Sequence, residues 1–374
     1  ALALGGGRPG SALVAAAEDD VARGAAPTAL AVALAAHLLR AGEIGRAWAC
    51  LDGHEGDDAL VLRAAVARRR GDLPLARALA VAAAASTRAP VRDRAKALLA
   101  RLAWDEGRLD EAEAHLSGAA GPAAAEVAAL VAYGRGLLRE GLLHVESGLA
   151  VAADDESRAR LEGTRGMLLH GDGQAAASAE AFARAVDLAV RAGAVVEEAS
   201  YLTGHAAAAS DAGALGLCLI SGRRAALLWE RLGRPRDAAR AWLAVAAACA
   251  TAGAAHAADE AAAHAERYAR EAGDTRTRAY ALWAQVEVRP AGDFEAHRLA
   301  VRASELLAPH GPGDRLRAAA RLLLWAPGFV GPAAAADLDG EAKGAPLPAR
   351  LDWLGARAAV AVDNGSEDAE RILG

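Results

Sequence analysis

The strongest constraint on this chain is a unit of two helices joined by a turn, which recurs along most of the sequence. Its clearest copy spans residues 161–190, where a glycine-rich break at residues 171–173 separates two helical segments. In the second segment, apolar and small residues recur every three or four positions, at Ala175, Ser178, Phe182, Ala185 and Leu188. This spacing keeps one face of a helix apolar, so that each helix can be buried against its neighbours. The repetition predicts an all-α fold made of stacked helices.

Small residues in this unit indicate where its helices cross. Gly166 in the first segment and Ser178 in the second have little or no side chain, so two helices can approach closely there. Phe182 lies one turn beyond Ser178 and can fill the space beside that contact. We therefore predict that Phe182 is buried between the helices of its own repeat and the repeat that follows.

The same unit resembles a tetratricopeptide repeat. The family pattern has Leu-Gly and then an aromatic residue in the first helix, and Ala-x3-Phe in the second. Here Arg165-Gly166 and Leu169 occupy the first set of positions, and Ser178 and Phe182 occupy the second. The resemblance implies a tetratricopeptide-like α-solenoid, a right-handed superhelix of antiparallel helix pairs.

Glycines expected in the turns indicate the length of the repeats. The period is about 34 residues for Gly42, Gly71, Gly107, Gly141 and Gly173, and lengthens to about 40 for Gly213, Gly253 and Gly292. We therefore expect a flexible leader at residues 1–10, a repeat array at 11–326, a loop rich in proline and glycine at 327–348, and a partial terminal repeat at 349–374. In that last part, Trp353 and Leu354 beside a short partner helix are expected to form a poor cap.

The long repeats after residue 173 are similar to the repeat region of large LuxR-type, MalT-like transcriptional regulators of actinobacteria. Such regulators also carry a P-loop ATPase domain and a DNA-binding helix-turn-helix, and neither motif occurs in this sequence. The resemblance implies a non-catalytic, cytoplasmic region that senses an effector or binds a partner. The alternatives are a free-standing adaptor that binds a peptide in its concave groove and, with less support, an all-α enzyme.

Residues that could carry chemistry lie in arrangements with structural explanations. His256, Glu260 and His264 follow one another at steps of four, so the two histidines stand about 12 Å apart along the helix axis and all three cannot share one metal ion. Residues 154–156, Asp-Asp-Glu, open a helix, where the helix dipole favours negative charge. We expect no catalytic activity, no cofactor and no metal site.

The charge balance gives no sign of a nucleic-acid or membrane partner. The net charge is only −6, and the longest uncharged stretch, residues 241–258, is mostly alanine and continues the repeats. Residues 63–110 hold eleven basic and five acidic residues, which we interpret as a solvated helix face, with an acidic partner surface as the alternative. Three widely spaced cysteines are typical of reduced thiols in the cytoplasm.

The resemblance also places a ligand groove, because the first helix of each tetratricopeptide pair lines the concave face. Positions counted back from the expected turn glycines, together with two charged neighbours, give the candidate groove residues Arg94, Arg101, Trp104, Arg135, Leu138, Glu162, Met167 and His170. Arginines beside apolar side chains suit an anionic, amphipathic ligand. We therefore expect a protein or peptide partner, or a small amphipathic effector.

Overall fold

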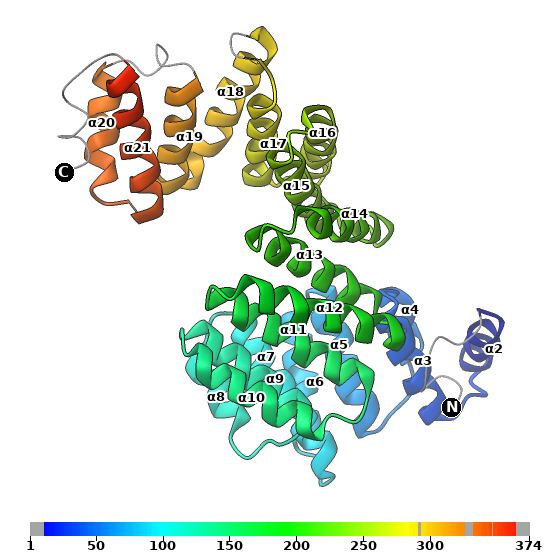
Figure 1. The fold of residues 1–374 in the computed structure, drawn as a ribbon. Helices are drawn as coiled ribbons and strands as arrows, with labels where there is room; N and C mark the ends of the chain where they lie inside the picture. The colour runs from blue at the N-terminus through cyan, green and yellow to red at the C-terminus, as the bar shows by residue number, and fades with distance from the viewer. Residues whose placement is uncertain (1–10, 291–292, 326–331, 346, 364–374) are drawn as a thin grey trace. The chain divides into compact units, whose positions relative to one another are not determined.

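Helices make up all the regular secondary structure of the described residues in the computed structural model, as expected (Figure 1). These residues are 11–290, 293–325, 332–345 and 347–363. The expected leader, the turn expected at Gly292 and the final residues of the expected terminal repeat lie outside them. The chain divides into two compact units, Ala1–Leu228 and Trp229–Gly374, which we call unit 1 and unit 2.

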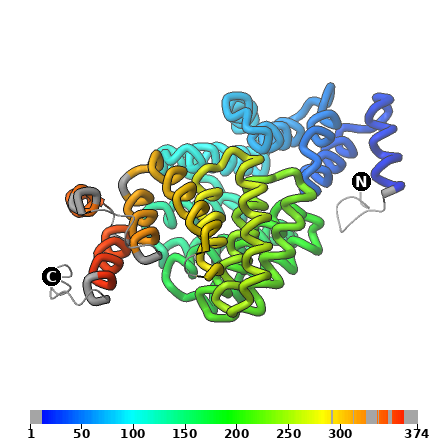
Figure 2. Tube along the Cα trace, turned by 90° about the horizontal axis from the view of Figure 1, so that it is seen from above, coloured from blue at the N-terminus to red at the C-terminus, as the bar shows by residue number. Residues whose placement is uncertain are grey.

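Unit 1 is a stack of helix pairs. It contains α2 (Ser11–Ala22), α3 (Thr28–Arg40), α4 (Ile44–Ala49), α5 (Asp57–Arg70), α6 (Leu73–Ala84), α7 (Ala89–Asp105), α8 (Leu109–Leu116), α9 (Pro122–Gly134), α10 (Leu138–Val151), α11 (Asp155–Gly171), α12 (Ala175–Ala192), α13 (Val195–Asp211) and most of α14 (Leu215–Arg231). Each pair has a first helix with an odd number and a second helix with an even number. The tube in Figure 2 shows the green helices α11 to α13 turning back one alongside the other, and these neighbours pack closely.

Unit 2 continues with α15 (Pro235–Thr251), α16 (Ala255–Glu271), α17 (Thr275–Glu287), α18 (Phe294–Leu307), the short 3-10 helix η1 (Ala308–His310), α19 (Pro312–Trp325), α20 (Pro332–Ala342) and α21 (Leu347–Asp363). One ion pair repeats along this unit. Arg236 Nε lies 3.0 Å from Asp274 Oδ2, and 40 residues later along the sequence Arg276 Nε lies 3.0 Å from Asp314 Oδ2. The recurrence agrees with a repeat length of about 40 residues.

Glycine with a positive φ closes most helices in the middle of the chain. From Gly173 to Gly273 such a glycine occurs every 20 residues, and Gly193, Gly213, Gly233 and Gly253 lie between. At Gly173 (φ 75°), the next residue's N–H donates back to the Leu169 carbonyl at 2.9 Å, which satisfies a carbonyl at the helix end. Glycine is needed because side chains disfavour this left-handed conformation.

The turn expected at Gly141 was wrong. The turn glycine of that repeat is Gly136, with φ 75°, whereas Gly141 lies inside α10 and is buried. A Cβ on Gly141 would stand only 2.6 Å from Cδ2 of Leu168 on α11. Gly141 therefore serves the close packing of two helices, and positions counted back from it were shifted.

Small residues form most of the core, and Phe182 fills the largest gap between them in its repeat. The Phe182 side chain is 5% exposed. A Cβ on Gly166 of α11 would lie 2.8 Å from its ring, and one on Gly204 of α13 would lie 2.6 Å from it. Ser178 Oγ donates a hydrogen bond to the Gly166 carbonyl at 2.8 Å. The predicted burial of Phe182 between two successive repeats is confirmed.

The end of unit 2 corrects two expectations. Residues 327–348 were expected to form a loop, but they contain α20, and α21 starts at Leu347. Pro332 is the first residue of α20, where a missing N–H costs no hydrogen bond, so proline there is compatible with a helix. Trp353 is fully buried among residues of α19, α20 and α21, and its indole N–H donates to Asp339 Oδ1 at 2.8 Å. These helices cover the tryptophan that we expected to be poorly capped.

Replacing Phe182 with alanine is expected to lower the free energy of unfolding by about 3–5 kcal/mol, because the buried ring leaves a cavity. Urea unfolding followed by circular dichroism measures this. Phe294→Ala is the matched control, since Phe294 is 81% exposed and should change stability by only about 0.5 kcal/mol. Equal effects at the two positions would contradict the packing described for Phe182.

Two glycine-to-alanine changes in unit 1 are expected to have opposite signs. Gly204→Ala should destabilise by about 1–3 kcal/mol, because its Cβ meets the confined Phe182 ring. Gly216→Ala on α14 meets no atom within 4 Å, and should be neutral or stabilise by up to about 1 kcal/mol. Thermal or urea unfolding of both variants tests the prediction, which fails if Gly204→Ala is the more stable protein.

Candidate functional site

The first helices of unit 1 come together on one face, which we call the inner face: α3, α5, α7, α9, α11 and α13. Consecutive first helices pack side by side, and α3 also contacts α13. Ion pairs join the distant helices, because Arg40 Nη1 of α3 lies 3.3 Å from Glu156 Oε2 of α11, and Arg69 of α5 pairs with Glu197 of α13. A solenoid brings non-consecutive repeats together on its inner side, so these contacts identify the concave face of unit 1.

Glu126 on α9 is the centre of a charged network on this face. Its carboxylate is bound from both sides: Arg101 Nη1 of α7 lies 3.2 Å from Oε1, and Arg160 Nε of α11 lies 3.2 Å from Oε2. Glu126 is only 9% exposed, and a buried carboxylate needs such partners to remain charged. It is also the one charged residue in α9, which is otherwise composed of apolar residues and glycine.

The network extends from Glu126 toward both ends of the inner face. On one side, Arg160 Nη1 also lies 3.2 Å from Glu156 Oε1, and Glu156 binds Arg40 as described above. On the other side, Arg101 Nε lies 3.2 Å from Asp105 Oδ1, and Arg68 Nε of α5 lies 2.7 Å from Asp105 Oδ2. Seven charged groups from five first helices are thus joined in one chain of ion pairs.

The pKa of the Arg160 guanidinium is raised despite its surroundings. Burial acts to lower this pKa, but Glu126 and then Glu156 outweigh it. The Arg160 side chain nevertheless keeps 34% of its surface exposed. It is therefore permanently charged and accessible from the hollow of the inner face.

Tyr201 on α13 brings a phenol hydroxyl into the same region. Its ring lies against Gly163 of α11, where any Cβ would overlap it. Burial, followed by the charges of Glu197 and Glu126, raises the pKa of Tyr201 well above its ordinary value, so the phenol keeps its proton. Of the hydrogen bonds between described residues, none involves this hydroxyl. The hydroxyl can therefore donate to, or accept from, a bound group.

The inner face can thus bind a ligand that carries polar groups of both signs. Arg101 and Arg160 keep about a third of their surface exposed, at 27% and 34%, and Arg69 is 31% exposed. Each guanidinium has more N–H donors than its present partners occupy. A ligand carboxylate can bind these arginines, and a ligand amino or amide group can bind the carboxylates between them.

Arg101 is the candidate groove residue that the structure places in this network. Its guanidinium carbon stands 4.9 Å from the centre of the Trp104 ring. The Trp104 indole N–H donates to the Leu130 carbonyl at 3.0 Å, and the ring packs against a core cluster of α7, α8 and α9. Trp104 therefore supports Arg101 from the helix interface, and we expect its removal to lower stability as well as binding.

The remaining candidates lie elsewhere on the helix pairs. Arg94 pairs with Asp58, and Arg135 pairs with Asp110 and Glu113 of α8, at 2.7 and 2.8 Å. Both ion pairs join adjacent helices. Arg135 follows the last residue of α9, as a consequence of the shifted count from Gly141.

Leu138 is the first residue of α10, a second helix, and packs against the core shared with α9 and α11. Glu162 is buried and pairs with Arg184 Nη2 of α12 at 3.1 Å. His170 Nε2 lies 2.7 Å from Asp211 Oδ2 at the ends of α11 and α13. Met167 is half-buried on α11. None of these four has a printed contact with Glu126 or Arg160, so their part in a groove stays a prediction.

Sequence reasoning missed Glu126, Arg160, Glu156, Glu197 and Tyr201. Glu126 alone left a detectable signal, because a single carboxylate in an apolar helix requires a partner. The others follow from which first helices lie side by side, and the repeat pattern does not contain that information.

Other singled-out residues have local roles in unit 2. The ring of His264 stacks on Trp242 with 4.7 Å between ring centres, and His256 Nε2 lies 3.5 Å from Glu260 Oε1. Within the described part of the chain, no group of three metal-ligating side chains is close enough to hold an ion. None of the helices described is long and apolar enough to cross a membrane.

Comparison with solved structures agrees with a tetratricopeptide-like fold. A Rap protein complexed with competence and sporulation factor matches over 97% of this chain and 96% of its own, with a TM-score of 0.56 and 14% identity. The apo form of RapI matches over 96% of both chains, with a TM-score of 0.58 and 10% identity. Aspartyl phosphate phosphatase F of Bacillus subtilis matches over 84% of this chain and 91% of its own, at 0.51 and 12%.

These identities are low, so the likeness establishes the fold, a solenoid of stacked helix pairs. No protein-family model matches the chain, and no curated protein matches its sequence.

The Asp58 carboxylate is expected to make stability depend on acid pH. Burial acts to raise the pKa of Asp58, but hydrogen bonds from Arg88 and Arg94 outweigh it, so this pKa is lowered on folding. A lowered folded pKa contributes stability above the unfolded pKa of about 3.9, and this contribution is lost as the pH falls through the folded pKa. Urea midpoints of the wild type and Asp58→Asn should therefore differ near pH 7 and converge below about pH 4.

Arg94→Gln should reduce the pH-dependent difference between wild type and Asp58→Asn, because it removes one of the two partners. A difference that stayed constant down to about pH 3 would contradict the assignment.

Proposed function

We propose that this chain is a non-catalytic binding module and that the inner face of unit 1 binds a short peptide in an extended conformation. The charged network centred on Glu126 carries the proposal. It places accessible arginines next to carboxylates across first helices that are far apart in the sequence. A peptide offers the complementary groups, because its termini, its amides and its charged side chains provide donors and acceptors along one line.

The geometry favours a ligand that exchanges partners with the network. A peptide carboxylate that binds Arg101 or Arg160 replaces one carboxylate contact with another, so the buried charges stay paired throughout. The Tyr201 hydroxyl supplies a neutral donor at the same place. A purely apolar ligand would leave the arginines and carboxylates desolvated without new partners, which costs free energy.

The structural likeness supports a peptide-binding adaptor more than the sensor region of a LuxR-type regulator. One of the similar folds, a Rap protein, is complexed with competence and sporulation factor. The resemblance to LuxR-type, MalT-like regulators rests on the length of the repeats after residue 173, and no comparison supports it. It remains a prediction, which a reading frame continuous with an ATPase or helix-turn-helix segment would support.

Arg101→Glu is expected to weaken binding of peptides selected on the wild type by about tenfold or more, since it replaces a charge-assisted donor with a like charge beside Glu126. Fluorescence anisotropy with labelled peptides, first selected from an array of short sequences, measures the affinity. Arg139→Glu is the matched control, because Arg139 is exposed on the second helix α10 and the charge change is the same.

Both variants should retain the helical circular dichroism of the wild type. The proposal fails if the array yields no peptide that binds, or if Arg139→Glu weakens binding as much as Arg101→Glu does.

A further inference from the structure

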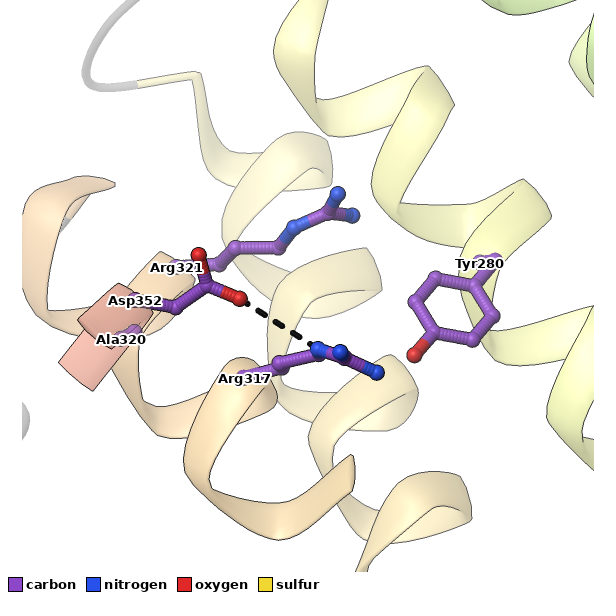
Figure 3. A pocket seen from close by; sticks show the side chains of 5 residues that line it. All are labelled: Tyr280, Arg317, Ala320, Arg321 and Asp352. Carbon is purple, nitrogen blue, oxygen red and sulfur yellow. Dashed lines mark hydrogen bonds and ion pairs between the residues drawn. The ribbon is translucent and has the colours of Figure 1, made fainter. Parts of the chain in front are cut away.

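Unit 2 contains a pocket that is separate from the inner face of unit 1 and does not depend on the function proposed for it. Tyr280 of α17, Arg317, Ala320 and Arg321 of α19, and Asp352 of α21 line it. Its volume is about 370 Å³, which lies within the range of small-molecule sites. Figure 3 shows Arg317 and Arg321 reaching from α19 toward Tyr280, with the Asp352 carboxylate beside them.

The arginines of this pocket have weak partners. Arg317 Nε lies 3.3 Å from Asp352 Oδ2, the contact drawn in Figure 3, and Arg321 Nη1 lies 3.5 Å from Glu287 Oε1. The two acidic side chains are 55% and 51% exposed. Ion pairs this long and this exposed contribute little, because water competes for both partners.

A neighbouring arginine shows what a structural ion pair looks like in this unit. Arg276 binds Asp314 through two nitrogens, each at 3.0 Å from a different carboxylate oxygen. The Tyr280 hydroxyl donates to Asp314 Oδ1 at 2.9 Å, and Asp314 is only 5% exposed. With these bonds made, Asp314 offers Arg317 only a distant contact, at 3.9 Å. The charge of Arg317 is therefore poorly neutralised.

The two pocket arginines also repel each other. Arg317 and Arg321 are four residues apart on α19, a spacing at which side chains of like charge are neighbours and destabilise a helix. A negatively charged group between them would remove this repulsion and could accept hydrogen bonds from both guanidiniums. The Tyr280 ring, whose centre is 5.7 Å from the Arg321 guanidinium carbon, gives the pocket a flat apolar wall beside these donors.

We propose that this pocket binds a small ligand that carries an oxyanion, a phosphate or a carboxylate, on a flat apolar group. The oxyanion lies between Arg317 and Arg321, and the apolar group lies against Tyr280 and Ala320. Asp352 competes with the ligand for Arg317, so binding displaces the exposed carboxylate from that arginine.

Inorganic phosphate, phenyl phosphate and benzoate are the probes that test this site, by calorimetric titration of the full chain. Phenyl phosphate should bind more tightly than inorganic phosphate because of the apolar wall. Binding of phenyl phosphate without benzoate, or the reverse, identifies the oxyanion and supports the site. If neither binds, the proposal is overturned.

Substitutions then locate the bound probe. Arg317→Ala and Arg321→Ala should each weaken its affinity by about tenfold, whereas Arg302→Ala, at an exposed position on α18, should change it by less than about twofold. Equal losses in all three variants would show non-specific attraction and overturn the proposal.

Asp352→Asn provides a test that does not rely on removing an arginine. It keeps the shape of the side chain and removes the competing charge, so it should strengthen binding of the probe. If Arg317→Asp352 were only a structural contact, Asp352→Asn would lower the thermal midpoint and leave affinity unchanged or weaker, and that result would overturn the proposal.

Discussion

Close approach between neighbouring helices is the constraint on which the rest of this structure depends. Alanine fills most buried positions of α15 and every buried position listed for α16, and glycines stand where helices cross, as at Gly141 against Leu168. Helices this close make many contacts per residue, but small side chains interlock poorly and specify the alignment of two helices weakly. A few larger residues compensate, and Phe182, held between Gly166 and Gly204, is the clearest.

Ion pairs supply the alignment that an alanine core leaves open. The pair between Arg236 and Asp274 recurs one repeat later between Arg276 and Asp314, and it joins successive first helices at the same level. Burying such pairs stabilises a fold little, since desolvation offsets the attraction, but a misaligned pair would leave charges unpaired. The network around Glu126 in unit 1 follows the same logic on the inner face.

The periodicity of small and apolar residues was enough to predict the helical repeats and the burial of Phe182, because both depend on positions within one repeat. It failed at Gly141, since glycine serves turns and helix crossings alike, and only φ distinguishes Gly136 as the turn. It also failed at Trp353, because counting prolines ignores that a helix accepts proline in its first turn. Of the inner-face network it identified Arg101 alone, since pairing across helices depends on their relative alignment.

The spacing of the turn glycines from Gly173 to Gly273 has a consequence for how this chain can change in length. Each helix and its turn occupy 20 residues there, so every helix begins in the same rotational phase as the one two places before it. Deleting one residue inside a helix turns all that follows by about 100° about its axis and points the alanine face toward water. Length can therefore vary in this segment by a whole helix pair, and single-residue insertions are confined to the turns.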